Sequence, residues 1–167
     1  MKSNLLILGA GGHGLVVEEV ARSMNCYMEI AFLDDNNPDA SGRLADYQQF
    51  AEHFDQAFVG IGDNYLREEW IMKLCKAGYK IPTLIHPSAY VSPSAKIDGG
   101  TIVEPLAVVN ANALIEFGCI ISVGSIVDHN ALIRRCAHVN AGAICKAGSI
   151  IERCVKLEAG EIIMGYK

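Results

Sequence analysis

The sequence predicts two folded parts: a small α/β domain over residues 1–80, followed by a prism-shaped parallel β-helix over residues 81–167. In the first part, apolar runs alternate with segments of helical spacing. In the second part, aliphatic residues recur at every sixth position. The charge changes at the same place: residues 1–80 hold seven basic and twelve acidic residues, net −5, whereas residues 81–167 hold seven of each.

Composition excludes several classes of protein. Half of the 167 residues are apolar, 20% are charged and the net charge is −5, which disfavours nucleic-acid binding. No apolar run reaches the roughly 18 residues of a membrane span. The apolar run before Gly9 has only four residues, so it favours a first strand over a secretory signal. Six cysteines without a C-x-x-C pair or metal-ligand spacing indicate small core residues of a reduced, cytoplasmic protein that holds no metal.

The first part alternates strands and helices. Strands are expected at residues 5–8, 30–33 and 57–61, and helices at residues 15–24 and 67–77, the second ending before Gly78. This alternation predicts a small parallel sheet with crossover helices.

The second part repeats with a period of six. All but one of the residues at this step are aliphatic: Ile85, Val91, Ile97, Val103, Val109, Ile115, Ile121, Val127, Ile133, Val139, Cys145, Ile151, Leu157 and Ile163. A small residue follows four positions after most of them, as Ala131 follows Val127. Each hexad then forms a short strand and a turn, and three hexads form one coil of 18 residues. The aliphatic residue fills the prism, and the small residue lets the corner close over it.

These hexads, together with LGAGGHG at 8–14, FLDD at 32–35 and GIGDN at 60–64, resemble the hexapeptide-repeat sugar acetyltransferases of the NeuD/PglD type. The resemblance implies a Rossmann-like domain before a left-handed β-helix. It implies transfer of an acetyl group from acetyl-CoA to a hydroxyl or amino group of a sialic acid or nucleotide-linked sugar, in surface polysaccharide or glycan synthesis. It also implies a homotrimer with active sites between adjacent prisms.

The loop Gly9-x-Gly11-x-x-Gly14 and the later Asp34 meet the dinucleotide fingerprint on paper. NAD binding, a structural tight turn and a cradle for a nucleotide sugar are all compatible with it. The resemblance favours the cradle, with Gly11, Gly12 and His13 against the ligand.

Acidic or amide residues follow two of the expected strands of this part. By the resemblance, Asp34 and Asp35 would contact the uridine or ribose, although a turn rich in Asp and Asn explains them equally well. Asn64 lies where α/β sheets bind ligands. The alternative is that Asp63 or Asn64 caps a helix and Arg67 is solvated.

The catalytic hypothesis rests on Asp128-His129-Asn130. His129 holds the third position of its hexad, which points outward from the prism. By the resemblance it is the general base, a role that suits a neutral imidazole, although a plain surface histidine remains an alternative. Asn130 stands where the family has a carboxylate, so the base would be weaker unless Asp128 substitutes. Direct transfer needs no acyl-enzyme, so no cysteine is expected to act as nucleophile.

The resemblance places His138, Gly142 and Ala147 on the acetyl-CoA side of the site. His138 would lie near the thioester, and the backbone N–H groups at Gly142 and Ala147-Gly148 would hold the oxyanion. A surface corner is the alternative for His138. Turn residues Arg134, Arg135, Lys146, Arg153 and Lys156 are solvated corners or contacts to CoA phosphates.

The chain stops at Gly165-Tyr166-Lys167, within a coil, where family members continue through further coils. The expected function is an acetyl-CoA-dependent sugar acetyltransferase. The alternatives are a non-catalytic or degenerate nucleotide-sugar-binding trimer and a nicotinamide-dependent enzyme. The sequence alone leaves the sugar, and N- or O-acetylation, open.

Overall fold

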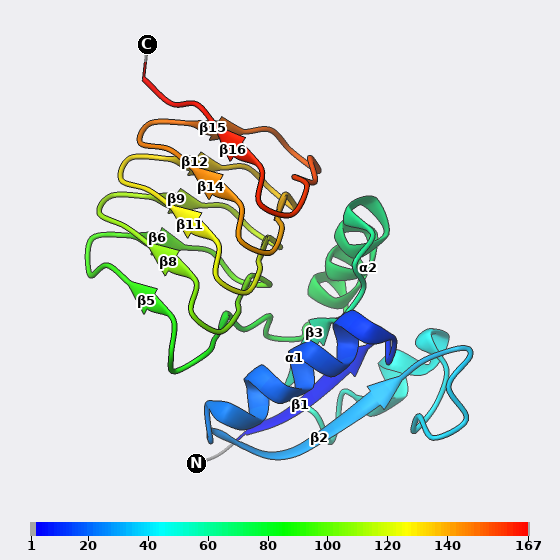
Figure 1. The fold of residues 1–167 in the computed structure, drawn as a ribbon. Coiled ribbons are helices and arrows are strands. Elements are labelled where there is room, and N and C mark those ends of the chain that lie inside the picture. Colours follow the sequence, from blue (N-terminus) through cyan, green and yellow to red (C-terminus); the bar gives the residue numbers. More distant parts are fainter. Residues whose placement is uncertain (1–2, 167) are drawn as a thin grey trace. The chain divides into compact units, whose positions relative to one another are not determined.

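The computed structural model describes residues 3–166 and divides into two compact units, Met1–Pro82 and Thr83–Lys167 (Figure 1). Within the described residues, no helix has the length and hydropathy needed to cross a bilayer.

The first unit is a three-stranded parallel sheet in the order β2-β1-β3. Its elements are β1 (Ser3–Leu8), α1 (Gly12–Ser23), β2 (Tyr27–Leu33), the 3₁₀ helix η1 (Leu44–Phe50), β3 (Gln56–Val59) and α2 (Asn64–Lys76). The central strand β1 is fully buried from Leu5 to Leu8. Because β1 is central, the loop that follows it lies between the ends of β2 and β3.

The predicted α/β alternation is confirmed, but several boundaries differ. Helix α2 begins at Asn64, three residues early, because Asp63 caps it by accepting from the Leu66 N–H at 2.8 Å. The 3₁₀ helix η1 was not predicted. Cys26 and Cys75 are exposed, so the prediction that all six cysteines are core residues is wrong for these two.

The second unit consists of stacked coils whose strands have two residues each. These strands are β4 (Leu84–Ile85), β5 (Tyr90–Val91), β6 (Lys96–Ile97), β7 (Ile102–Val103), β8 (Val108–Val109), β9 (Leu114–Ile115), β10 (Ile120–Ile121), β11 (Ile126–Val127), β12 (Leu132–Ile133), β13 (His138–Val139), β14 (Ile144–Cys145), β15 (Ile150–Ile151) and β16 (Ile162–Ile163). Each paired strand lies parallel to the one 18 residues away, as Val127 pairs with Val109 and Cys145. Three sheets form the faces of the prism: β13-β10-β7-β4, β16-β14-β11-β8-β5 and β15-β12-β9-β6. The six-residue period and the three-hexad coil are therefore confirmed.

The core of the prism and its corners follow from the hexad. The second residue of each central strand and the small residue four positions later are buried together, as Val127 and Ala131 are. Between them the fourth residue of the hexad turns the corner with a positive φ, for example +57° at Asn130 and +68° at Gly148. Glycine and asparagine adopt this conformation most readily, which explains their recurrence at this position. The positive φ of this corner therefore accounts for an asparagine at position 130.

Candidate active site

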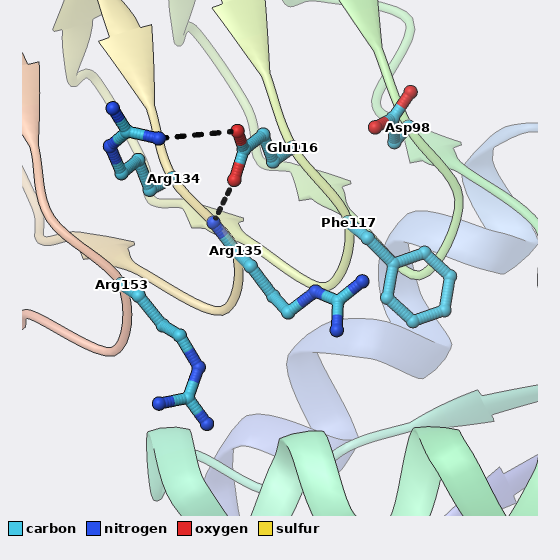
Figure 2. Close-up of a pocket in the computed structure, with 6 residues that line it drawn as sticks. All are labelled: Asp98, Glu116, Phe117, Arg134, Arg135 and Arg153. Atoms are coloured by element: carbon cyan, nitrogen blue, oxygen red, sulfur yellow. Dashed lines mark hydrogen bonds and ion pairs between the residues drawn. The ribbon is translucent and has the colours of Figure 1, made fainter.

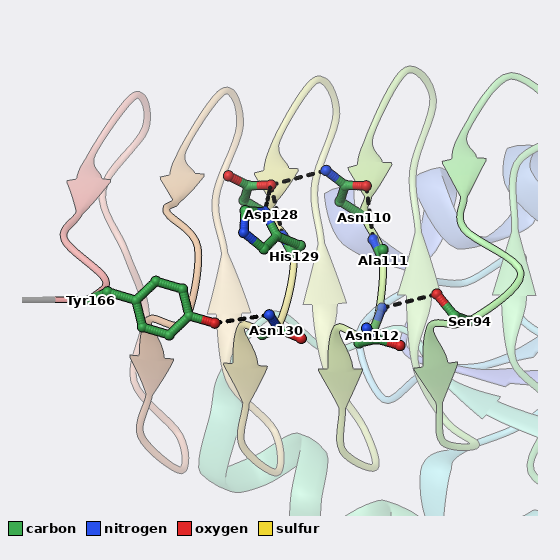
Figure 3. A network of polar contacts seen from close by, with 8 residues as sticks. All are labelled: Ser94, Asn110, Ala111, Asn112, Asp128, His129, Asn130 and Tyr166. Atoms are coloured by element: carbon green, nitrogen blue, oxygen red, sulfur yellow. Dashed lines mark hydrogen bonds and ion pairs between the residues drawn. The ribbon is translucent and has the colours of Figure 1, made fainter.

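His129 lies on the corner that follows strand β11. About half of its side chain is exposed, as expected for an outward-pointing position. Its Nδ1 lies 2.9 Å from Oδ1 of Asp128, the residue before it. Figure 3 shows the two side chains together, with Asn110 beside them on the preceding coil. The histidine thus has a carboxylate partner.

The Asp128 carboxylate determines which nitrogen of the neutral ring carries the proton. Its Oδ1 also accepts the backbone N–H of His129 at 2.7 Å and Nδ2 of Asn110 at 2.9 Å. The backbone N–H and side chain of His129, followed by Asn110, hold the pKa of Asp128 below its usual value. The carboxylate is ionised near neutral pH and can only accept hydrogen bonds, so Nδ1 of a neutral His129 carries the proton. Nε2 then keeps a lone pair and can accept a proton.

Asn130 does not take part in this pairing. Its Nδ2 donates to the hydroxyl of Tyr166 at 2.8 Å (Figure 3). The structure therefore does not support the hypothesis that Asn130 orients the histidine ring. Asp128 contacts the ring instead. The Tyr166 ring lies 6.4 Å from the His129 ring, centroid to centroid, and packs where a Cβ at Gly148 would overlap it.

A pocket beside this corner is lined by Asp128, Lys146, Ala147, Met164, Gly165 and Tyr166. Ala147 lies 18 residues after His129, which is the equivalent position on the next coil. Its N–H donates to no other group in residues 3–166, whereas the Gly148 N–H donates to the His129 carbonyl at 3.0 Å. The Gly142 N–H donates to the Val123 carbonyl at 3.0 Å and is not available to hold an oxyanion. Among the backbone N–H groups of Gly142, Ala147 and Gly148, only that of Ala147 is therefore available to an oxyanion.

His138 belongs to another face of the prism. It is the first residue of β13, only 8% exposed, and its Nε2 lies 3.0 Å from Oγ of Ser122. It is therefore a buried strand residue, and the surface-corner alternative is wrong.

Four of the basic turn residues divide between two corners, and the fifth, Lys156, pairs with His138 through a backbone bridge instead. Arg134, Arg135 and Arg153 line a pocket with Asp98, Glu116 and Phe117, shown in Figure 2. In this pocket Arg134 forms ion pairs with Glu116 at 3.8 Å and with Glu152 at 3.2 Å. Lys146 lies instead in the pocket beside Asp128.

In the first unit, the glycines at the strand ends are of two kinds: some are closely packed and others are open. A Cβ at Gly14 would overlap the carbonyl oxygen of Gly9, and one at Gly60 would lie 2.7 Å from the Cα of Gly14. These glycines permit close packing of α1 against the strand ends. Gly11 and Gly12 have nothing within 4 Å of such a Cβ, and α1 starts at Gly12 without a side-chain cap. The half-buried His13 follows in the first turn of α1.

Asp34 accepts a hydrogen bond from this loop. Its Oδ2 accepts the Ala10 N–H at 2.7 Å, and its Oδ1 accepts the N–H groups of Asn36 and Asn37 at 2.8 and 2.9 Å. The hydrogen bond from Ala10, followed by that from Asn36, holds the pKa of Asp34 below its usual value. The neighbouring Asp35 accepts the Leu44 N–H at 3.1 Å.

A buried arginine holds the loop after β3. Arg67 is 1% exposed and donates to the carbonyls of Ile61 and Gly62, each at 3.2 Å. It also donates to Oδ1 of the buried Asn64 at 2.8 Å. The alternative of a solvated Arg67 is therefore wrong. The spacing of Arg67 with the buried Ile71 and Leu74 places it on the inner face of α2, and this signal was present in the sequence.

The comparisons with known proteins agree in both units. The family model of the PglD N-terminal domain matches residues 4–74. The acetyltransferase domain of PglB from Neisseria gonorrhoeae FA1090, solved in complex with acetyl coenzyme A, is 33% identical with a TM-score of 0.92. The match covers 97% of this chain and 82% of that one. The chain belongs to the PglD-like family of sugar acetyltransferases.

Other relatives of this PglD-like chain are described as N-acetyltransferases. A perosamine N-acetyltransferase from Caulobacter crescentus, solved as a variant with CoA and GDP-perosamine, is 25% identical with a TM-score of 0.91. That match covers 97% of this chain and 89% of that one. UDP-N-acetylbacillosamine N-acetyltransferase of Bacillus subtilis (strain 168) is 31% identical over 107 residues, which are 59% of this chain. The match spans only half of the length of that curated relative.

These matches confirm the resemblance and the fold class: a Rossmann-like α/β domain followed by a left-handed parallel β-helix. Three residues of the PglD-like chain stand out only in the structure: Asn110, Ala111 beside it, and Tyr166, all shown in Figure 3. Asn110 was not predicted, although its partner lies exactly one 18-residue coil away, so the coil period places the two residues at the same corner.

Proposed function

We propose that this chain is an acetyl-CoA-dependent N-acetyltransferase that acts on an amino group of a nucleotide-linked sugar in glycan or surface polysaccharide synthesis. The observation that carries the proposal is the His129–Asp128 pair, which leaves Nε2 able to accept a proton at an open corner. The relatives, which are N-acetyltransferases of bacillosamine and perosamine and a PglB domain in complex with acetyl coenzyme A, support the amino group, the nucleotide sugar and acetyl-CoA.

The reaction we propose needs one base and one oxyanion donor. The amine nitrogen forms a bond to the thioester carbonyl carbon, and its proton passes to Nε2 of His129. The ionised Asp128 stabilises the imidazolium through Nδ1–H. The Ala147 N–H, one coil further on, donates to the oxygen on which negative charge develops. The carbon–sulfur bond then breaks, and the thiolate of CoA takes the proton from His129. We assign the buried His138 and the corner at Gly142 to binding of acetyl-CoA.

We assign the nucleotide part of the sugar substrate to the first unit. Gly11, Gly12 and His13 form the open N-terminus of α1, where backbone N–H groups and the helix dipole favour a pyrophosphate. Asp34 keeps this loop in place, and Asp35 and Asn64 lie after the ends of β2 and β3, where such sheets bind ligands.

We further propose that the chain works as a homotrimer. The outward residues of the five-stranded sheet β16-β14-β11-β8-β5 are all apolar: Tyr90, Val108, Ile126, Ile144 and Ile162. Tyr90 and Ile162 are more than half exposed. Such a continuous apolar stripe is typical of an interface, and it ends at the His129 corner. A second and third copy are therefore the proposed partners for this face.

The six cysteines form no disulfide in residues 3–166, and four of them are buried. Free thiols suit a reducing compartment, and acetyl-CoA and nucleotide sugars are the proposed substrates. We therefore assign the protein to the cytoplasm.

The test is a screen of UDP- and GDP-linked amino sugars and sialic acid with acetyl-CoA, in which thiol release is measured. Thiol release that depends on one amino sugar, with an acetamide product by mass spectrometry, supports the proposal. Calorimetry with acetyl-CoA is the second measurement. If a folded trimer binds no acetyl-CoA, a nucleotide-sugar-binding protein without catalysis replaces the proposal.

A further inference from the structure

Asn110 reaches across one coil of the β-helix to the Asp128 carboxylate. It follows strand β8 at the same corner as Asp128 follows β11, exactly one coil of hexads earlier in the stack. Its Nδ2 donates to Oδ1 of Asp128 at 2.9 Å, and its own Oδ1 accepts the Ala111 N–H at 2.8 Å. The backbone N–H therefore fixes the amide so that its NH₂ group faces the carboxylate.

Oδ1 of Asp128 is the point where three donors meet. The backbone N–H of His129, its Nδ1 and Nδ2 of Asn110 lie 2.7, 2.9 and 2.9 Å from that oxygen. Two of these donors belong to His129: its backbone N–H holds this oxygen beside the same corner, and its ring nitrogen is the group that has to be positioned. Asn110 is the donor that comes from a different coil, which the backbone ladder holds in register.

The ammonium group of Lys146 can compete with Asn110 for the Asp128 carboxylate. Lys146 occupies the same corner on the following coil and lines the same pocket as Asp128. Asp128 is about one third exposed and forms no ion pair with Lys146 within residues 3–166. A carboxylate between an amide donor and an ammonium group can turn toward either one. If it turned toward Lys146, His129 would lose the acceptor of its Nδ1–H.

We propose that Asn110 is a positioning residue for the transfer reaction, holding Asp128 in the orientation that keeps the proton of His129 on Nδ1 and leaves Nε2 open. This proposal rests on the proposed function in one respect, namely that His129 is the base. Asn110 itself lies behind the carboxylate and acts only through it.

The test uses Asn110→Ala and the isosteric Asn110→Asp, which cannot donate to a carboxylate when ionised. Both variants should lower kcat by roughly tenfold to a hundredfold, with KM values for both substrates nearly unchanged. ¹⁵N NMR of the His129 ring should show the Nδ1–H form in the native protein and a mixture of both tautomers in the variants. The pKa of Asp128, followed by ¹³C NMR, should rise because one hydrogen bond to the ionised form is lost.

Ser94→Ala is the matched control. Ser94 lies in the same stack of corners as Asn110, and its Oγ accepts the Asn112 N–H from the next coil at 3.1 Å, but its hydrogen bonds do not involve Asp128. Removing its side chain should leave the His129 tautomer and kcat as in the native protein.

The double variant Asn110→Ala/Asp128→Ala decides how Asn110 acts. If it acts through Asp128, the double variant should be no slower than Asp128→Ala alone. A slower double variant, or a native tautomer and native kcat in both Asn110 variants, overturns the proposal. If the native protein shows no acetyl transfer, the proposed function fails, whereas the NMR measurements still test the positioning of His129.

Discussion

At the scale of single residues, the site depends on which carboxylate meets His129. The hexad places Asn130 at the corner with φ +57°, where asparagine is favoured, and its side chain bonds Tyr166. Asp128, one residue before the histidine, accepts Nδ1–H and the adjacent backbone N–H on one oxygen. A carboxylate can both orient the ring and stabilise its cation, which an amide cannot do. Asp128 thus supplies, within the same corner, the carboxylate that Asn130 lacks.

Replacing His129 with alanine should lower kcat by about a hundredfold or more, because the proton of the amine loses its acceptor. Binding of the nucleotide sugar should be unchanged, since the residues assigned to it lie in the first unit. Steady-state kinetics and calorimetry measure the two effects. An unchanged kcat would remove His129 from the mechanism.

Replacing Asp34 with alanine should destabilise the first unit by roughly 1–2 kcal/mol at neutral pH, because three backbone N–H groups lose their acceptor. The pKa of Asp34 is lowered in the folded state, so its stabilisation is present above the ordinary pKa near 3.8. It is lost as the pH falls through the lower folded pKa. Thermal melts at several pH values should therefore show native and variant proteins converging as the pH falls well below 3.8. A difference independent of pH would contradict this account.

At the scale of elements, the glycine-rich loop between β1 and α1 serves two purposes. Gly14 and Gly60 permit the backbone of α1 to approach the ends of β1 and β3, where a Cβ would overlap neighbouring atoms. Gly11 and Gly12 have open space instead. The motif that resembles a dinucleotide fingerprint thus contains structural glycines beside two that leave room for a ligand.

This division predicts different results for two alanine variants of the same helix. Gly14→Ala should destabilise the first unit by about 1–3 kcal/mol or prevent its folding, because the new Cβ meets backbone. Gly12→Ala should fold normally but bind nucleotide sugar more weakly, roughly tenfold, because a methyl group enters the space of the pyrophosphate. Circular dichroism melts and calorimetry separate the two effects. If Gly12→Ala binds as well as the native protein, the loop is not the cradle.

At the scale of the whole molecule, the β-helix has a buried interior and faces of different character. The interior is filled by the hexad residues of every coil. The outward face of the five-stranded sheet is apolar from Tyr90 to Ile162, and it borders the corner that carries His129. A trimer assembled through this face would place the corner of one prism beside another prism, as the family resemblance predicts.

Replacing Ile126 with lysine, at the centre of this face, should convert the trimer to monomers, because the interface would bury an unpaired charge. Ile150→Lys on the neighbouring sheet is the matched control and should remain trimeric. Size-exclusion chromatography with light scattering measures both. A trimeric Ile126→Lys, or a monomeric Ile150→Lys, would contradict the assignment of the face.

The α/β unit and the coiled prism could be predicted from the sequence, because the prism repeats one local rule, whereas the left-handed winding followed only from the family resemblance. Every sixth residue must fill the interior and every corner needs a small residue, so the period of six is visible without coordinates, as at Val127 and Ala131. The α/β alternation of the first unit was visible for the same reason, since burial imposes a period on each element. The hexad placed His129 on the outside of the prism, and the family resemblance made it the candidate base.

The tertiary structure alone decided which groups the candidate residues contact. Asn110 meets Asp128 from 18 residues away, Asn130 bonds Tyr166 from 36 residues away, and Asp34 holds Ala10 across the ends of two strands. The N–H of Gly142 proved to be occupied, and Arg67 proved to be buried. The coil period places residues 18 or 36 apart at the same corner, but whether their side chains form a hydrogen bond depends on distances of a few tenths of an ångström, which only the tertiary structure gives.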